Sequence, residues 1–345
     1  MSRPHPKPDP TRGPHLRLAT YNVEWFNALF DDQGRLLEDN APGQRHGINR
    51  GDQLAALGIV FTALDADGVM VIEAPDTNGR RSSVKALETF AAAYGLRCRR
   101  AVTGFKSETE QEISFLYDPD KLTARHDPQG DPRFDGTFYY DLNDDGAPEP
   151  IRPSKPPLEL AVTAGGQSFR LIGVHVKSKA PHGARHPAEA TRISIENRRK
   201  QLAECLWLRE RIDGHLAARD DLIVLGDFND GPGLDEFERL FGHSGVEVVM
   251  GVGCTPDCQL VDPHAEMALK SRLQPTTARF WNVEHARYFE ALLDFIMVSP
   301  GLARRSPHWR IWHPLNDPKC WAVPELREAL LQASDHFPVT LDLPL

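Results

Sequence analysis

The sequence of 345 residues has few cysteines, no long hydrophobic run and no excess of positive charge. Its five cysteines are an odd number spread along the chain, which argues against a disulfide framework. No apolar stretch reaches the roughly 18 residues that a membrane-spanning helix needs. The formal net charge of -9 argues against binding to nucleic acid through a broad basic surface. It does not exclude a nuclease, because metal-binding carboxylates contribute to an acidic total.

The first 15 residues are polar and proline-rich and lack the apolar segment of a secretory signal. We expect a disordered tail there, and a cytoplasmic protein. Residues 16–345 are expected to form one domain, with a loop insertion rich in Pro, Gly and Asp at about 126–157. No obligate protein partner is evident from the sequence, and we expect a monomer.

The hydrophobic pattern predicts strands and helices in mixed order, without the regular alternation of a Rossmann sheet. Two alternating runs around Gly165 and Gly166 predict a hairpin. Helical spacing and capping signals predict helices at 48–64, 82–95, 188–213 and 234–242. Further strands are expected at 16–22, 67–75, 112–117, 222–227, 292–299 and 334–343.

Polar side chains suited to metal binding or proton transfer occur at or near the ends of most of these strands. Each alone has a structural explanation, such as a turn cap or a hydrogen-bonded core histidine. Asp294 is harder to explain in this way, because a carboxylate inside the apolar run LLDFIM needs a cation or donor nearby. The full set is Asn22, Glu24, Glu73, His175, Asp227, Asn229, Asp294, Asp335 and His336.

Together these residue types indicate one kind of chemistry. Carboxylates and amides with few cysteines suit a hard cation such as Mg²⁺ or Mn²⁺, not zinc. Two histidines and an Asp-Asn pair supply proton transfer and the positioning of a water nucleophile. The combination fits hydrolysis of a phosphoester.

Seven segments in order, among them TYNVEWF, VIEAPD, LIGVHVKSK, IVLGDFND and SDHFPV, resemble the endonuclease/exonuclease/phosphatase superfamily, also called DNase-I-like. The resemblance covers residues 16–343. It implies an α+β fold, a four-layer sandwich of two packed mixed β-sheets with helices outside. It also implies that Glu73 is the principal metal ligand, that Asn22 and Glu24 bind or orient the metal, and that Asp335 is a second metal-site ligand.

The same resemblance implies catalytic roles. Asp227 would orient or deprotonate the attacking water, and Asn229 would hold the phosphate. His336 would be the catalytic histidine, with Asp294 fixing its tautomer and charge. His175 would be a second histidine at the phosphate.

A neighbouring acidic or amide side chain would orient His175, and strand alternation favours Glu112 over Gln111. One departure from the family pattern is Ile72, which stands where the residue before the metal-binding glutamate is usually Gln. A hydrogen bond that supports the metal ligand is therefore missing or comes from elsewhere.

Lysines and arginines follow His175 closely. Lys177 and Lys179 are candidates for substrate binding, and the cluster at 192–200 is either a basic rim for a phosphate backbone or a solvated helix face. Trp281, Trp309 and Trp312 would contact a membrane, stack on bases or pack in the core.

Two further motifs have mainly structural interpretations. Asp141, Asn143 and Asp145 resemble the start of a calcium loop, but Arg152 at the twelfth position excludes a full EF-hand, and an Asx-rich turn is favoured. Cys254 and Cys258 favour a local disulfide or two free thiols over a structural metal site.

We therefore expect a divalent-metal phosphodiesterase, most readily a DNA or RNA endonuclease with nucleic acid as its substrate. A phosphatase, or a sphingomyelinase-like esterase of lipid or inositol phosphates, is the alternative on the same site. A non-catalytic binding module is a third hypothesis. The intact set of acids, amides and histidines argues against it, because binding alone does not require this set.

Overall fold

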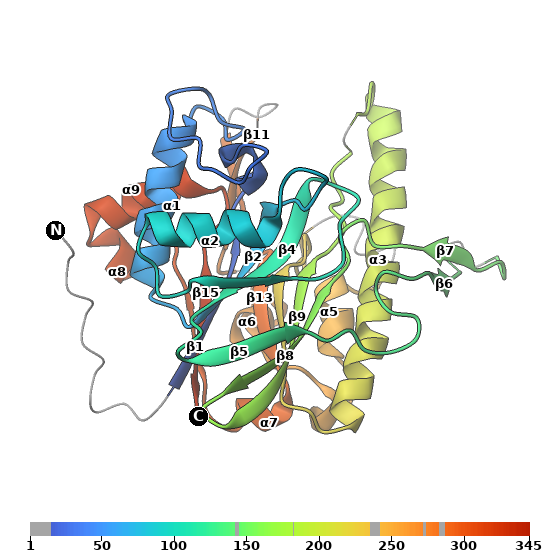
Figure 1. The fold of residues 1–345 in the computed structure, drawn as a ribbon. Coiled ribbons are helices and arrows are strands. Elements are labelled where there is room, and N and C mark those ends of the chain that lie inside the picture. The colour runs from blue at the N-terminus through green and yellow to red at the C-terminus, as the bar shows by residue number, and fades with distance from the viewer. Residues whose placement is uncertain (1–14, 142–144, 182, 235–241, 272–273, 283–286) are drawn as a thin grey trace.

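The computed structural model describes residues 15–141, 145–181, 183–234, 242–271, 274–282 and 287–345. Two β-sheets pack face to face, and helices cover the outer face of each (Figure 1). The expected α+β sandwich of four layers is therefore confirmed. In the described part of the chain, no helix combines the length and the apolar character needed to cross a membrane.

Both large sheets are mixed, with parallel and antiparallel neighbours. The first has the order β14-β15-β1-β2-β4-β3, and the second has the order β13-β10-β9-β8-β5. The strands of the first sheet are β1 (His15–Asn22), β2 (Gly68–Pro75), β3 (Arg100–Thr103), β4 (Gln111–Tyr117), β14 (His308–Ile311) and β15 (Val339–Pro344). Those of the second are β5 (Leu122–His126), β8 (Leu158–Ala164), β9 (Gln167–His175), β10 (Leu222–Asp227) and β13 (Asp294–Val298).

The helices fall into two groups by the sheet that they cover. On the first sheet lie α1 (Arg50–Leu64), α2 (Ser83–Ala93), α8 (Pro318–Trp321) and α9 (Pro324–Ala333). On the second lie α3 (Pro187–Ala217), α5 (Gly245–Met250) and α6 (Pro263–Lys270). The remaining helices of the described residues are η1 (Phe26–Leu29), η2 (Pro256–Cys258) and α7 (Pro300–Ala303).

Strand alternation divides most of the buried apolar side chains among three large cores. In β1, Leu16 and Leu18 lie between the two sheets, whereas Tyr21 packs with the side chains of α1 and α2. In β10, Leu225 lies between the sheets and Val224 packs with the side chains of α3. Successive strand residues point to opposite faces, so one strand serves two layers. Each fully buried leucine contributes roughly 1.5–3 kcal/mol to this packing.

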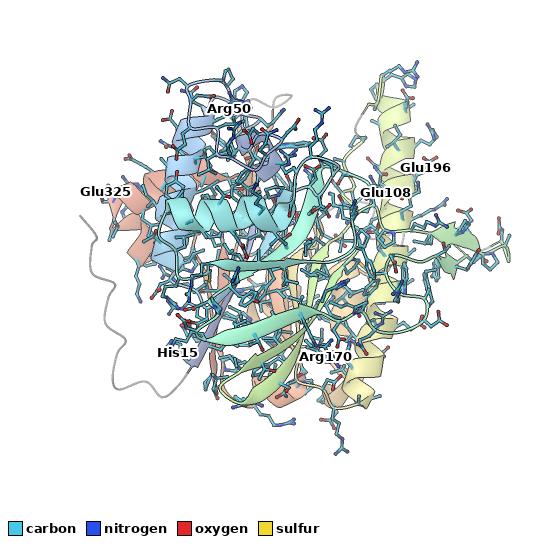
Figure 2. All side chains as sticks on the ribbon, in the orientation of Figure 1. His15, Arg50, Glu108, Arg170, Glu196 and Glu325 are labelled. Carbon is cyan, nitrogen blue, oxygen red and sulfur yellow. The ribbon has the colours of Figure 1, made fainter. Side chains whose placement is uncertain are left out.

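The ends of the parallel strands set the position of the site. His15 at the start of β1 and Arg170 near the start of β9 both lie low in Figure 2. β2 runs parallel to β1, and β10 runs parallel to β9. The carboxyl ends of these four strands therefore lie at the opposite edge, where the sheets bring their terminal residues together.

Several sequence expectations are refined by the structure. The hairpin around Gly165 and Gly166 is confirmed, and both glycines have positive φ (56° and 77°). The helix expected at 188–213 continues to Ala217. The helix expected at 234–242 falls almost entirely outside the described residues.

The segment at 126–157 is not only loop. It contains the antiparallel pair β6 (Phe138–Tyr140) and β7 (Glu149–Ile151), which projects beside α3 in Figure 1. A second small pair, β11 (Ala278–Asn282) and β12 (Arg287–Ala291), lies next to His336, because Ala278 bridges to that residue.

Candidate active site

Strand register places three of the expected residues side by side on the second sheet. His175 on β9 and Asp294 on β13 are the neighbours of Asp227 on β10. This close arrangement depends on Gly226, whose φ is 147°. A Cβ at Gly226 would lie 2.0 Å from the carbonyl oxygen of Val174. Glycine is therefore required where β9 and β10 approach each other beside Asp227.

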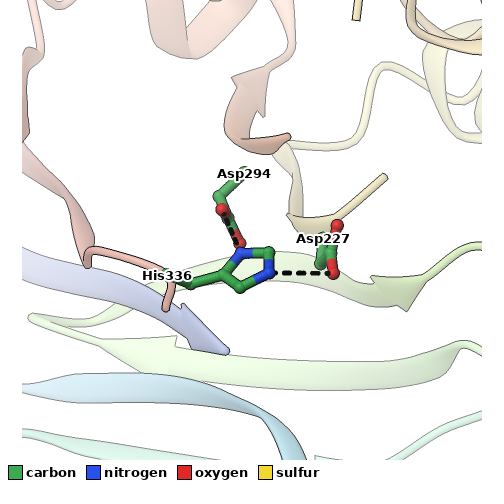
Figure 3. Close-up of side chains that lie close together, drawn as sticks. All are labelled: Asp227, Asp294 and His336. Atoms are coloured by element: carbon green, nitrogen blue, oxygen red, sulfur yellow. Dashed lines mark hydrogen bonds and ion pairs between the residues drawn. The ribbon is translucent and has the colours of Figure 1, made fainter. Parts of the chain in front are cut away.

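His336 connects two of the buried carboxylates (Figure 3). Its Nδ1–H donates to Asp294 Oδ2 over 2.8 Å, and its Nε2 lies 3.9 Å from Asp227 Oδ2. All three side chains are buried. Burial alone would lower the pKa of His336, but the charges of Asp294 and Asp227 outweigh it and raise the pKa well above its usual value. The imidazolium is thus held with Nε2 directed toward Asp227.

Asp227 is held by amide donors from both sheets. Asn22 on β1 donates from Nδ2 to Asp227 Oδ2 over 3.0 Å, which joins the first sheet to the second. The backbone N–H of Asn229 donates to Asp227 Oδ1 over 2.7 Å. Burial raises the pKa of Asp227 above its ordinary value, while His336 and these donors oppose the rise. A carboxylate with a raised pKa is a better proton acceptor than a solvated aspartate.

Asn229 acts on Asp227 in this structure and is not positioned for the predicted phosphate contact. Its Nδ2 donates to the carbonyl of Val176 over 3.0 Å and to Asp227 Oδ2 over 3.3 Å. An amide nitrogen has two hydrogens, and both are used. Phe228 between these residues is buried against Phe295, as strand alternation predicts.

The expected metal ligands Glu73, Glu24 and Asp335 lie near enough to one another for their charges to interact. Glu73 has a φ of 61° at an irregularity between β2 and β4, and its Oε2 accepts from the backbone N–H of Trp25 over 2.8 Å. Glu24 accepts from the backbone N–H of Asp335 over 3.1 Å. Glu24 is also paired with Arg45, a residue that no sequence motif singles out.

The donor set fits a hard cation. Burial raises the pKa of Asp335 to about 7, and the nearby charges of Glu24 and Glu73 add to the rise, whereas His336 and Arg45 oppose it. A divalent cation would offset this crowding of carboxylates. Asp227, Asp294 and His336 also lie close enough to hold a metal ion, with their ligand atoms within 4.8 Å of one another. Among the described residues no other group of three such side chains has its ligand atoms this close together. Glu73, Glu24 and Asp335 remain the ligands that the family resemblance implies.

The predicted contact between Glu112 and His175 is absent. Glu112 accepts from the backbone N–H groups of Thr77 and Ser107 over 3.3 and 3.0 Å, so its carboxylate holds a loop of the first sheet. Among the described residues His175 Nδ1 has no hydrogen-bond partner. His175 Nε2 lies 3.7 Å from Asp227 Oδ2 and 3.1 Å from Lys155 Nζ. Lys155 was not predicted from the sequence, because it stands in the presumed insertion without a motif.

The basic residues after His175 have mainly structural contacts. Lys179 Nζ donates to Asp230 Oδ1 over 2.7 Å, so the structure ties this predicted substrate-binding residue to a buried carboxylate. Arg198, which the sequence placed on a basic rim or a solvated face, is fully buried and also bonds to Asp230, over 3.2 Å. Asp230 is thus a buried carboxylate that binds both Lys179 and Arg198. Lys177 is half-buried, and its backbone N–H donates to Glu204 over 2.8 Å.

Burial and hydrogen bonding show the structural state of the calcium-loop pattern, the cysteine pair and the tryptophans. Asp141 accepts from the backbone N–H groups of Asp145 and Gly146, four and five residues on, and Asp145 accepts from that of Ala147, two residues on, as in an Asx turn. Asn143 of the calcium-loop pattern lies outside the described residues. Cys254 and Cys258 are exposed free thiols. Trp312 is buried and Trp309 donates to the carbonyl of Ile296, whereas Trp281 on β11 is 47% exposed.

Solved structures with a similar fold include several enzymes. Zebrafish (D. rerio) TDP2 complexed with a single-strand DNA product is 13% identical, with a TM-score of 0.51 over 96% of this chain and 99% of that chain. The human nocturnin catalytic domain is 13% identical, with a TM-score of 0.51 over 96% and 95%. An AP endonuclease from Archaeoglobus fulgidus is 14% identical, with a TM-score of 0.50 over 96% and 100%. At these identities the likeness establishes the fold alone.

No curated protein matches this sequence. Residues 115–336 match the Endonuclease/Exonuclease/phosphatase family. The matched segment runs from β4 to His336 and includes His175, Asp227 and Asp294. Members of this family are generally hydrolases that act on phosphoesters. The chain therefore belongs to the Endonuclease/Exonuclease/phosphatase family.

Proposed function

We propose that this protein hydrolyses phosphodiester bonds of DNA or RNA with the help of Mg²⁺ or Mn²⁺. The observation that carries the proposal is the buried arrangement of Asp227, His336 and Asp294, with His336 bonded to Asp294 and directed toward Asp227. It combines a proton acceptor with a proton donor less than 4 Å away, which is the pair that attack by water on a phosphoester requires.

Asp227 is the group that takes a proton from the attacking water. Its carboxylate is fixed by Asn22 on one sheet and by Asn229 on its own strand end. These bonds leave the carboxylate little freedom to rotate, so the water would be held in one orientation. Its raised pKa brings its basicity closer to neutral pH.

His336 is the group that donates a proton during the reaction. Asp294 holds the proton on Nδ1, so the proton on Nε2 is free to be donated to a phosphate oxygen or to the leaving oxygen. A metal ion, when bound by Glu73, Glu24 and Asp335 with Asn22 close by, would supply positive charge at the phosphate oxygens.

Nucleic acid is the substrate that the surroundings of the site support best. Trp281 and Tyr288 on the β11–β12 hairpin are about half exposed, and their rings form an edge-to-face pair 5.0 Å apart. The guanidinium of Arg279 stacks over Tyr288, and its backbone N–H donates to the carbonyl of Asp335 beside His336. Aromatic and arginine side chains beside a phosphate site fit the stacking of bases. The D. rerio TDP2 structure with a single-strand DNA product lends fold-level support.

Plasmid nicking tests the proposal directly. Supercoiled plasmid, single-stranded DNA and RNA are incubated with the protein and Mg²⁺ or Mn²⁺, with EDTA as the metal-free control. We expect metal-dependent cleavage that falls by about 10²–10⁴-fold in Asp227→Asn, because a proton acceptor is lost while the side-chain shape is kept. The matched control Asp257→Asn changes an exposed aspartate in η2 and should cleave like the wild type.

Assays with other phosphoesters can refute the nuclease assignment. Sphingomyelin and inositol phosphates are assayed in parallel, and turnover of these without cleavage of any nucleic acid would contradict it. Calorimetry with Mn²⁺ addresses the metal site, because Glu73→Gln should weaken binding whereas the exposed Glu108→Gln should not. A protein that neither binds metal nor turns over any phosphoester would be a binding module.

A further inference from the structure

Lys155 places a positive charge inside the candidate active site. It stands at the end of the 126–157 segment, two prolines before β8, and its side chain reaches His175 on the neighbouring strand β9. The distance from Lys155 Nζ to His175 Nε2 is 3.1 Å. Lys155 borders a small pocket whose other walls include Phe134, Trp207 and Leu208. An apolar pocket of this kind accommodates the methylene stem of a lysine while its ammonium reaches a polar site.

The bond between Lys155 and His175 determines the state of the histidine. An ammonium group has hydrogens to donate and no lone pair to accept. His175 Nε2 must therefore accept, which makes the imidazole neutral with its hydrogen on Nδ1. Burial, Lys155 and His336 all lower the pKa of His175, which agrees with a neutral ring. A neutral ring whose Nε2 is already occupied cannot donate a proton from that atom to a phosphate.

The ammonium faces the centre of the site. Burial lowers the pKa of Lys155, whereas the charges of Glu73, Asp227 and Glu204 oppose this and that of Lys177 adds to it. The same ammonium contacts a ring nitrogen that lies 3.7 Å from Asp227. Within the described residues Lys155 makes no other hydrogen bond, so two of its three N–H donors remain for a ligand.

We propose that Lys155 is a catalytic residue that binds a non-bridging phosphate oxygen of the substrate, and that His175 is a positioning residue that holds the ammonium. The proposal rests on the proposed phosphoesterase function and assigns the positive charge on this side of the phosphate to Lys155. A fixed cation in a partly buried site stabilises the charge that develops on phosphate oxygens during attack by water.

Turnover of bis(p-nitrophenyl) phosphate with Mn²⁺ gives the first test. Lys155→Met keeps the stem and removes the ammonium. We expect kcat to fall by about 10²–10³-fold and KM to rise, because the contact to the phosphate oxygen exists before attack and strengthens during it. Lys155→Arg should restore part of the lost kcat, because it returns a cation with different geometry. The control Lys121→Met removes an exposed lysine in the turn between β4 and β5 and should leave kcat unchanged. If Lys155→Met keeps kcat within about threefold of the wild type, the proposal is overturned.

Nuclear magnetic resonance of the imidazole nitrogens gives a readout that needs neither metal nor turnover. In the metal-free wild type, His175 should be neutral with its hydrogen on Nδ1 at neutral pH. In Lys155→Met the Nε2 atom loses its donor, so the pKa of His175 should rise, with His336 as the remaining nearby cation. A wild-type His175 with its hydrogen on Nε2 would overturn the proposal, because that atom could not accept from Lys155.

Binding of inorganic phosphate separates this proposal from the proposed function. A wild type that hydrolyses no phosphoester would refute the function, yet the ³¹P signal of inorganic phosphate would still report on Lys155. We expect phosphate affinity to fall by about tenfold or more in Lys155→Met and to be unchanged in Lys121→Met. Equal affinity of the wild type and Lys155→Met would overturn the role of Lys155 whether or not the enzyme is active.

Discussion

Replacing Asp294 with asparagine tests the charge that holds His336 in its protonated form. The Asp294 carboxylate lies 2.8 Å from His336 Nδ1, and both groups are buried. Asparagine can still accept the Nδ1–H through its carbonyl oxygen. Its NH₂ group would then take the place of Asp294 Oδ1, an atom that has no partner among the described residues. The variant therefore removes the charge while keeping the hydrogen bond.

The expected magnitude follows from the distance. An opposite charge this close shifts a pKa by about 1–3 units. An effective dielectric constant of about 20 gives about 4 kcal/mol for unit charges about 4 Å apart, which corresponds to about 3 units as an upper bound. Asp227 remains 3.9 Å from Nε2 in the variant, so part of the elevation persists. We expect the pKa of His336 to fall by about 1–3 units and kcat to fall by about 10³–10⁴-fold.

The same change alters the pH dependence of stability. Because the folded-state pKa of His336 is raised, its contribution to the free energy of unfolding is fully present below the unfolded value of roughly 6.5. That contribution is lost as the pH rises through the folded pKa. In Asp294→Asn the folded pKa is lower, so the decline in stability above neutral pH should become smaller.

Histidine titration by nuclear magnetic resonance in EDTA measures the pKa, and urea unfolding at several pH values measures the stability. Asp257→Asn serves as the exposed control. If the pKa of His336 stays within about half a unit of the wild-type value, the charge of Asp294 does not hold the proton and the reasoning is refuted.

Two further variants test the scaffold of the site by urea unfolding. Gly226→Ala should cost at least about 2 kcal/mol, because its Cβ would lie 2.0 Å from the Val174 carbonyl oxygen. Gly79→Ala, where a Cβ meets no described atom within 4 Å, should be nearly neutral, and equal stabilities would contradict the packing argument. Arg198→Met should cost about 3 kcal/mol, because Asp230 would keep Lys179 but lose a buried partner. As a control, Arg192→Met on the exposed face of the same helix should change the free energy of unfolding by no more than about 0.5 kcal/mol. If Arg198→Met also leaves the free energy of unfolding unchanged, the buried pair adds no stability.

Residues at strand ends were predictable from the sequence because their signal is local. An apolar run that stops at Asp227, or a carboxylate such as Asp294 within one, is visible without any knowledge of partners. Strand alternation also accounts for the burial of Phe228 between Asp227 and Asn229. The pairing of Asp227 with Asp294 and His175 follows from strand register, which only the structure shows.

The hydrogen-bond and ion-pair partners of these side chains were less predictable, because they depend on which side chains fill the space between elements that are distant in sequence. Glu112 points to the loop at Thr77 and Ser107, and alternation alone could not show that. Lys179 looked like a phosphate contact in sequence, but its neighbour in space is Asp230, which is already buried by α3. Spacing along a chain does not report the burial of a cation, and only burial distinguishes a structural ion pair from a substrate contact.

The sequence by itself determined the α+β sandwich fold, the family and the set of candidate acids, amides and histidines. These follow from the periodicity of hydrophobic residues and the order of motifs, which are both properties of the linear chain. Only the tertiary structure decided which of these groups bond to one another. It joined Asn22 of one sheet to Asp227 of the other and brought Arg45 to Glu24. It also placed Lys155 against His175 across a segment without any motif. The physical reason is that hydrogen bonds and ion pairs act over about 3–4 Å in space, whereas the residues that form them here are 20 or more positions apart in sequence.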